Sequence, residues 1–170
     1  MNVISLQQIA DPKPDDFAGE TKDVLAYWHS IAGEDSLPAW SMFDWMQMPL
    51  PVIPWCSVGD IVSYEPIRVA YRFWGTQRVG LFGKEYTGKT SDDIADPEAR
   101  KRILREYLEV AAARTPIIIE KRIKLPGETH AYHMLRLPFT NNTASDVTHV
   151  LSALFISRPA INALEGKFRP

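Results

Sequence analysis

The stretch YRFWGTQRVGLFGKEYTGKTSDDI, residues 71–94, decides how the whole chain is interpreted. Its centre, GKEYTGKT at 83–90, matches the phosphate-loop pattern of Gly, four residues and Gly-Lys-Thr. A working phosphate loop leaves a buried strand and opens a helix whose N-terminal amides hold the phosphates. Here the preceding apolar run, VGLF, is too short for such a strand, and Pro97 interrupts the helix that should follow. We therefore predict a turn region without a nucleotide, in which Gly83 and Gly88 supply positive φ angles.

The stretch begins inside the clearest strand pattern of the chain. Apolar residues alternate with their neighbours along IRVAYRFW, residues 67–74, which predicts a strand with one buried face. Further strands are predicted at residues 52–62, 116–125, 129–139 and 147–157. Pro-Gly between the third and fourth of these five strands favours a hairpin. The last strand is the most apolar, so we expect it near the centre of the sheet.

Capping residues and apolar spacing predict three helices. A leading helix is expected at 20–33 with Thr21 as its N-cap, and a short helix is expected at 39–47. A longer helix is expected at 97–113, where Asp96 is the N-cap and a proline occupies the first helical position. These helices alternate with the strands in the order of an α+β protein.

The composition indicates one soluble domain. The chain has 170 residues, is 45% hydrophobic and 24% charged, and carries a formal net charge of −2. This balance gives no basic footprint for nucleic acid, and no apolar run reaches the roughly 18–20 residues that span a bilayer. The N-terminal residues lack the pattern of a signal peptide, so we expect a cytoplasmic protein. Cys56 is the single cysteine, which excludes an internal disulfide.

The order of helix, two strands, short helices, one longer helix and three strands resembles a PAS domain. YRFWGTQRVGLFGKEYTGKTSDDI is similar to the core of the bacterial PAS_5-type family of single-domain proteins. In that family a strand ends in an aromatic-rich Gly-Thr, followed by a short helix, a Gly and a Thr-Gly-Lys or Thr-Gly-Arg step. AYWHSIAGEDSLPAW, residues 26–40, resembles the leading helix of the same family. The resemblance covers residues 22–157.

The resemblance implies a five-stranded antiparallel sheet with short helices on one face and an N-terminal flanking helix. Closely spaced prolines and aspartates, among them Pro12 and Pro14, predict a flexible N-terminal arm (1–19) before the PAS-like domain (20–157) and a C-terminal tail (158–170). The domain includes the leading helix and a Trp/Pro-rich segment at 37–55. PAS domains enclose haem, flavin, a small organic molecule or nothing between helices and sheet, and they often dimerise through the flanking helix.

The predicted ligand pocket combines apolar side chains with a few polar groups. Its residues are Tyr71, Phe73, Val79, Phe82, Tyr86, Ile103, Tyr107, Ile119, His133, Leu135 and Leu151. Three of them, Tyr71, Tyr107 and His133, carry the polar groups. The alternative interpretation is that the same residues fill a solid core.

The ligand itself stays unknown, and neither haem nor flavin is expected. Haem needs an axial ligand, usually histidine, and the longer helix at 97–113 contains none. His133 is the first alternative ligand, although a strand histidine on an apolar face is more often a core residue. A photochemical flavin adduct needs a helical cysteine near the pocket, and Cys56 lies on the first strand. His130 and His133 point to opposite faces of a strand, so they do not chelate a metal together.

The tryptophans suggest an interaction surface. Trp28, Trp40, Trp45 and Trp55 lie outside the predicted pocket, and aromatic residues are enriched at interfaces. They are expected either to form a homodimer or partner contact, or to cap the outer face of the sheet within one chain.

These features predict a non-catalytic PAS-type sensory or regulatory module. It would bind a small molecule or an unidentified signalling protein, and would signal through dimer or partner contacts. One alternative is a small cone-shaped α+β enzyme with a pocket acid–base pair, which requires His133 beside a carboxylate in a deep cavity. The other alternative is a ligand-free interaction scaffold with a filled core.

Overall fold

Residues 2–10, 12–17, 19–33, 37–141, 146–165 and 167 are described by a computed structural model of the chain. They form an α+β protein with one antiparallel sheet of strand order β1-β4-β5-β6-β2-β3. The strands are β1 (Asn2–Ala10), β2 (Cys56–Tyr64), β3 (Ile67–Trp74), β4 (Ile117–Leu125), β5 (Glu128–Phe139) and β6 (His149–Ile156). The five predicted strands are β2 to β6, so the antiparallel α+β architecture is confirmed. The most apolar of them, β6, lies inside the sheet as expected.

The sixth strand corrects the prediction of a flexible arm. Residues 1–19 were expected to be loose, but Asn2–Ala10 forms an edge strand that pairs antiparallel with β4, with a register shift between Ser5 and Gln7. An edge strand is held through its backbone, which needs no long alternating pattern. The prolines that suggested a loose arm begin only at Pro12, after the strand has ended.

The helices are α1 (Gly19–Ala32), α2 (Thr76–Phe82), α3 (Pro97–Ala113) and α4 (Arg158–Leu164). The predicted cap of α3 is confirmed, because Asp96 Oδ1 accepts hydrogen bonds from the backbone of Glu98 and Ala99. The weakly patterned tail contains α4, which is capped by the Ser157 side chain. None of the helices in the described part of the chain has the length and apolar run that a membrane crossing requires.

The helix expected at 39–47 is a different structure. Two 3-10 turns, Trp40–Met42 and Trp45–Gln47, replace it, and a third follows at Ile53–Trp55. Asp44 adopts an extended conformation between the first two turns, and its side chain accepts a hydrogen bond from the Met46 amide. The aspartate thus ends one turn and caps the next, which divides the segment.

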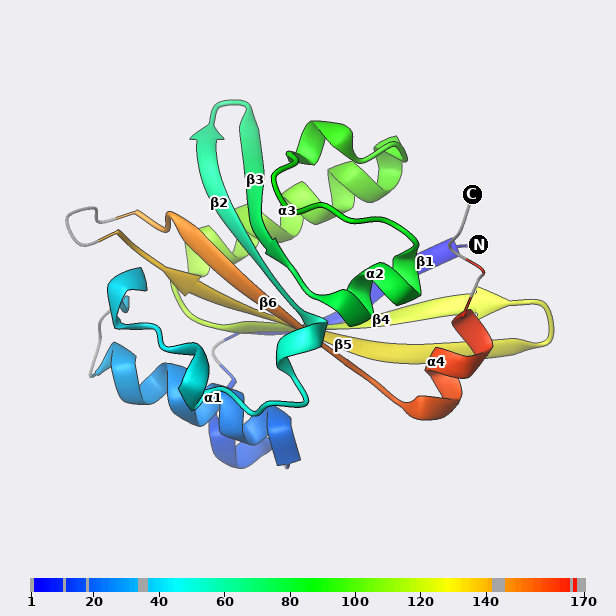
Figure 1. The fold of residues 1–170 in the computed structure, drawn as a ribbon, viewed down its shortest axis with the longest axis horizontal. Helices are drawn as coiled ribbons and strands as arrows, with labels where there is room; N and C mark the ends of the chain where they lie inside the picture. The colour runs from blue at the N-terminus through cyan, green and yellow to red at the C-terminus, as the bar shows by residue number, and fades with distance from the viewer. Residues whose placement is uncertain are drawn as a thin grey trace.

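Two groups of segments cover the sheet. Figure 1 shows α1 and the Trp/Pro-rich segment 37–55 on one side of the sheet, and α2 and α3 on the other. We refer to these two sides as the α1 face and the α3 face. Successive residues of a strand point to opposite faces. On β5, Leu135 therefore lies in the core of the α1 face, whereas its neighbour Arg136 contacts Glu106 of α3.

Two glycines permit close approaches that fix these layers. A Cβ at Gly59 of β2 would overlap the hydroxyl of Tyr107, so the glycine lets α3 lie close to the sheet. A Cβ at Gly75 would overlap the carbonyl of Pro54, which lies where α2 meets the Trp/Pro-rich segment. Both positions require glycine because the atoms in the way have little room to move.

The phosphate-loop match forms turns, as its context predicted. Gly83 (φ 72°) and Gly88 (φ 77°) both have positive φ, which confirms their predicted conformation. The loop follows α2 rather than a strand, and it leads into η5 (Ser91–Asp93), a 3-10 turn of three residues. This geometry differs from the strand–loop–helix arrangement that cradles phosphates.

Candidate functional site

A cavity of about 380 Å³ lies between the α3 face of the sheet and the helices α2 and α3 with the loop that joins them. Its volume falls in the range of roughly 300–1,000 Å³ that is typical of small-molecule sites. Six aromatic side chains line it: Tyr71, Trp74, Phe82, Tyr86, Tyr107 and Tyr132. Charged side chains from the helices and the sheet line the same space, so the cavity combines aromatic walls with fixed charge.

Sequence reasoning placed part of this lining correctly. Five of the predicted pocket residues line the cavity: Tyr71, Phe82, Tyr86, Ile103 and Tyr107. Val79 and Ile119 lie on segments that border the cavity but do not line it. The remaining four lie on the α1 face: Phe73, Leu135 and Leu151 pack in or against its core, and His133 is exposed there.

Three of the misplaced residues, His133, Leu135 and Leu151, share one physical cause, which is the choice of strand face. The apolar alternation of β5 and β6 was assigned to the ligand side, and a shift of one residue reverses every side chain. In the structure the apolar set faces α1, while Tyr132, Met134 and Arg136 of β5 line the cavity. The assignments of Phe73, Val79, Ile119, His133, Leu135 and Leu151 to the pocket are therefore corrected.

A buried ion triad forms one wall of the site. Glu106 of α3, which is 1% exposed, lies between Lys121 of β4 and Arg136 of β5. Lys121 Nζ is 2.7 Å from Glu106 Oε1, and Arg136 donates to Glu106 Oε2 from Nε at 3.1 Å and from Nη2 at 2.5 Å. Arg136 Nη1 also donates to Ser152 Oγ at 2.7 Å. Both oxygens of the carboxylate are thus engaged.

The triad sets the protonation of its members. Burial would raise the pKa of Glu106, but the charges of Arg136 and Lys121 outweigh burial and lower it below its usual value. Burial lowers the pKa of Lys121 to about 8, and Glu106 only partly offsets that effect. Glu106 is therefore a fixed anion at neutral pH, and Lys121 lies near the edge of its charged range.

Arg78 of α2 is a second buried cation, and it has no carboxylate partner among the described residues. It is 5% exposed, and its guanidinium carbon lies 4.4 Å from the centre of the Trp74 ring. Nη1 donates to the carbonyl of Trp55 at 3.3 Å and approaches the Met134 sulfur at 3.8 Å. Burial, with a smaller contribution from Arg136, lowers the pKa of Arg78 to about 10, so Arg78 remains charged at neutral pH.

Three nitrogen donors around the cavity have no hydrogen-bond partner within the described ranges. They are Arg78 Nε, Arg102 Nε and Trp74 Nε1, and all three atoms are buried. Their side chains all line the cavity and come from three elements, α2, α3 and β3. Buried polar groups are normally satisfied, so this concentration requires an explanation.

Sequence reasoning missed the charged half of the site, namely Arg78, Glu106, Lys121 and Arg136. A signal was present, because Lys121 and Arg136 interrupt otherwise apolar stretches of strand on the buried side. Charged residues at core positions are rare unless they are paired.

The histidines and the cysteine lie away from the cavity. His133 is exposed and pairs in register with Glu120 of β4, so it does not provide the deep acid–base pair of the predicted enzyme alternative. His149 stacks on Trp40 at a centroid distance of 5.3 Å, and its Nε2 lies 3.6 Å from Asp60 Oδ1. Burial raises the pKa of Cys56 to about 12, which keeps its thiol protonated. Within the residues that the structure describes, His, Cys, Asp and Glu form no group of three that could hold a metal ion.

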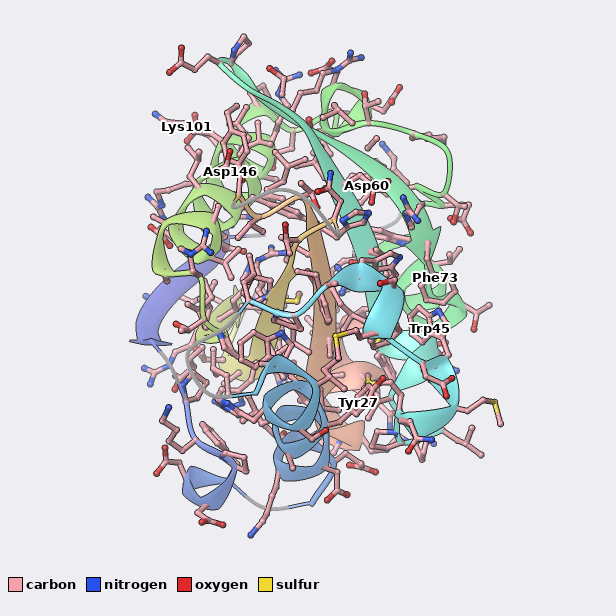
Figure 2. All side chains as sticks on the ribbon, turned by 90° about the vertical axis from the view of Figure 1, so that its left-hand side faces the viewer. Tyr27, Trp45, Asp60, Phe73, Lys101 and Asp146 are labelled. Atoms are coloured by element: carbon pink, nitrogen blue, oxygen red, sulfur yellow. The ribbon has the colours of Figure 1, made fainter. Side chains whose placement is uncertain are left out.

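The tryptophans predicted to form an interface pack mainly within the chain. Trp28 is 3% exposed, and its Nε1 donates to the Pro138 carbonyl at 3.0 Å, so its expected interface role is corrected. Trp40, Trp45 and Trp55 are half-buried. Figure 2 shows Trp45 beside Phe73 of β3, and their ring centroids lie 4.9 Å apart. The exposed large apolar side chains of the same segment are those of Met42, Met46 and Leu50.

Comparison with known proteins identifies no relative: no family model matches the chain, and neither a curated protein nor a solved structure matches it. The resemblance to PAS domains accordingly stays a prediction. The function has to be argued from the geometry of the cavity and its charges.

Proposed function

We propose that this chain is a non-catalytic sensory or regulatory module of the PAS type, which binds a small molecule between α3 and the sheet. The observation that carries the proposal is the aromatic cavity of about 380 Å³ that α2, α3 and the loop between them enclose against the sheet. These segments cross between β3 and β4 of the antiparallel sheet, in the order that the family resemblance implies. The volume and the mixture of aromatic and polar walls suit a small-molecule site.

The protonation of the cavity favours binding over acid–base catalysis. General acid–base catalysis needs a group that gains and loses a proton near the working pH. Glu106 is held ionised by two cations, and burial raises the pKa of Tyr71 and Tyr107, which keeps both hydroxyls protonated. Lys121 titrates nearest to neutrality, but its amine is engaged by Glu106 at 2.7 Å. These groups are suited to holding a ligand in place.

A route from the cavity to the surface runs through Arg78. Its Nη1 donates to the carbonyl of Trp55, the last residue of the Trp/Pro-rich segment. Gly75, the N-cap of α2, also donates from its amide to the carbonyl of Cys56 at 2.8 Å. A ligand that draws Arg78 toward itself would strain the hydrogen bond between Arg78 and the Trp55 carbonyl. The segment 37–55 would then shift on the sheet. Ligand affinity that differs between the two arrangements would then move their populations.

The receiver of the signal is proposed to be a second copy of the chain or a signalling protein. Met42, Met46 and Leu50 are 54%, 79% and 71% exposed on the segment that Arg78 contacts. Exposed apolar side chains gathered on one segment are typical of interaction surfaces. Ligand binding and partner binding would thus be coupled through one hydrogen-bonded connection.

Native mass spectrometry of protein purified without added cofactor, together with an absorbance spectrum, tests the proposal. We expect a co-purifying small molecule that is lost in Ala99→Trp, because Ala99 lines the cavity and the indole fills it. Ala112→Trp is the matched control, since Ala112 is exposed on the same helix.

Two of the following results would contradict the proposal, and the haem or flavin band would correct only the expected kind of ligand. Equal occupancy in Ala99→Trp and wild type would place the ligand elsewhere. A haem or flavin band would contradict the expectation that neither is the ligand. A protein that dimerises and never carries or accepts a small molecule would favour the interaction scaffold.

A further inference from the structure

Three of the unpartnered groups that line the cavity are nitrogen donors of one chemical kind, and a fourth, the Tyr107 hydroxyl, can both donate and accept. Arginine and tryptophan side chains only donate hydrogen bonds, so Arg78 Nε, Arg102 Nε and Trp74 Nε1 all call for an acceptor. We infer that the cavity is built for an oxyanion, namely a carboxylate or phosphate group carried on a planar apolar body, with Arg78 as its principal partner. This inference rests on the proposed small-molecule binding and specifies the chemical class of the ligand.

The charge of the cavity also favours an anionic ligand. Among its buried side chains, Arg78, Lys121 and Arg136 are cations, and Glu106 is the carboxylate that faces them. Both oxygens of Glu106 are occupied by Lys121 and Arg136. Asp96 also lines the cavity, but its Oδ1 caps the start of α3. The positive charge of Arg78 is therefore uncompensated within the described residues.

An uncompensated buried charge is costly, and the cost is relieved by an anion. Water satisfies a donor, but it does not neutralise a guanidinium. The chain as a whole carries a formal charge of −2, so general attraction to anions does not explain a positive interior. The excess positive charge is confined to this cavity, and a bound anion would neutralise it.

The orientation of Arg78 leaves its most useful edge unoccupied. Its hydrogen bonds to described residues leave from Nη1, and Nε has no partner. The edge formed by Nε and Nη2 is thus left for a ligand. Two parallel donors in this fork match the two oxygens of a carboxylate, or two oxygens of a phosphate. Stacking on Trp74 at 4.4 Å holds the guanidinium plane in place before a ligand arrives.

The other two donors define where the ligand body lies. Arg102 belongs to α3 and Arg78 to α2, so an oxyanion that reaches both would bridge the two helices. Tyr71, Tyr86 and Tyr107 line the same space and offer flat apolar surfaces. A planar body would pack on these rings while its charged group meets the donors. The combination favours an aromatic oxyanion over a free inorganic ion.

Isothermal titration with three matched probes tests the inference: 2-naphthoate, 2-naphthyl phosphate and the neutral 2-naphthamide. We expect at least one of the two anions to bind about tenfold more tightly than the amide, since a charge-assisted fork replaces a neutral contact. Comparison of the two anions identifies the oxyanion that the site prefers. Arg78→Met should reduce the preference for the anion to about threefold or less.

Further variants separate a binding role from a structural one. Arg78→Lys keeps the charge but loses the fork, so it should retain only part of the preference. Arg102→Met should weaken anion binding independently, which keeps the test valid if an Arg78 variant does not fold. Arg105→Met is the matched control, because Arg105 is exposed on the same helix as Arg102 and pairs with Glu109.

The outcomes distinguish this inference from the proposed function beneath it. If naphthamide binds as tightly as the anions, and Ala99→Trp abolishes all binding, the cavity takes small molecules but the oxyanion assignment is wrong. An unchanged anion preference in Arg78→Met and Arg102→Met would also overturn the assignment. If neither anion binds while native mass spectrometry finds a neutral ligand in the cavity, the binding function stands and the inference fails.

Discussion

The two faces of the sheet are built from the same strands but differ in what they bury. The α1 face buries a continuous apolar core against α1 and the segment 37–55. Its aromatic rings contact one another closely, as in the stack of Trp40 on Phe43 at 4.8 Å. The α3 face buries two arginines, a lysine and a glutamate around a cavity of about 380 Å³. One face buries apolar side chains, and the other buries charged side chains around a cavity.

This contrast separates the part of the molecule that stabilises it from the part that is suited to bind. Filled apolar cores contribute most of the favourable free energy of folding, whereas cavities and buried charges reduce it. Proteins retain such costly features where a site needs them. The difference between the two faces is therefore itself an argument for the α3 face as the functional one.

The largest expected effect is the loss of the carboxylate that neutralises the α3 face. Glu106→Gln leaves Lys121 and Arg136 buried without an anion. The free energy of unfolding should fall by about 3–5 kcal/mol, the usual cost of removing one partner from a buried ion pair. Urea unfolding followed by circular dichroism measures the change.

Glu109→Gln is the control, because Glu109 lies on the same helix and pairs with exposed Arg105. It should change the stability by less than about 0.5 kcal/mol. If Glu106→Gln were equally mild, the triad would not be the electrostatic centre of the α3 face, and the contrast between the two faces would be weakened.

The next effect compares equal truncations on the two faces. Leu137→Ala and Ile103→Ala each remove three carbons, but Leu137 is 1% exposed in the α1-face core, whereas Ile103 is half-buried and lines the cavity. We expect a loss of about 3 kcal/mol for Leu137→Ala and about 1 kcal/mol for Ile103→Ala. The same unfolding experiment compares them, and equal losses would mean that the α3 face is as tightly filled as the α1 face.

A smaller effect is the contribution of Lys121 to the pH dependence of stability. Lys121 has a pKa lowered to about 8, whereas an unfolded lysine titrates near about 10.4. Between pH 8 and about 10 the unfolded chain binds the proton that the folded chain has lost from Lys121, so this contribution increases with pH. Cys56 acts in the opposite direction, because its pKa is raised to about 12 and an unfolded cysteine ionises first, near about 8.5. At higher pH the raised pKa values of Tyr71 and Tyr132 also lower the stability, because unfolded tyrosines ionise first.

The part of the free energy of unfolding that depends on Lys121 should therefore rise by about 1–2 kcal/mol between pH 7.5 and 9.5. It is measured as the difference between the wild type and Lys121→Met, in which the contribution of Cys56 cancels and Glu106 stays paired with Arg136. A difference that does not vary over this window would show that Lys121 keeps its proton when folded. Urea unfolding at five pH values decides between the two.

The sequence predicted the elements better than it predicted the site. Strand and helix positions follow local rules, such as the alternation in 67–74 and the Asp96 cap, and these rules held. The edge strand Asn2–Ala10 was missed because its pairing with β4 is a tertiary contact, which a local sequence pattern does not predict. The turns at 40–47 were missed because Asp44 was not recognised as a cap.

Only part of the cavity lining was predicted correctly. Strand alternation separates the residues into two faces, but it does not identify the face that lines the cavity. Leu135 and Arg136 are neighbours, and the apolar residue was the natural choice for a pocket. The structure places Arg136 on the cavity side, where Glu106 from a helix 30 residues earlier compensates it. That compensation depends on the fold, so the sequence alone could not distinguish a buried, paired arginine from a solvated one.

The smallest change in stability is expected for substitution of Arg78, which we compare with substitution of Arg136. Arg78→Met removes an unpaired cation together with a hydrogen bond to Trp55 and the stack on Trp74. The relieved desolvation should offset these losses, leaving the ligand-free protein unchanged or up to about 1 kcal/mol more stable. Arg136→Met removes a partner of Glu106 and should cost about 3 kcal/mol or more.

Thermal unfolding of the two variants side by side then assigns a role to each arginine. Both side chains are buried and both line one cavity, so packing alone predicts similar effects. The electrostatic environments predict opposite effects on stability. Arg136 lies beside Glu106, whereas Arg78 has no carboxylate beside it among the described residues. If Arg78→Met destabilises the protein as much as Arg136→Met does, Arg78 holds the fold together, and the oxyanion inference loses its premise. If it is neutral or stabilising, the protein keeps Arg78 for something other than its own stability.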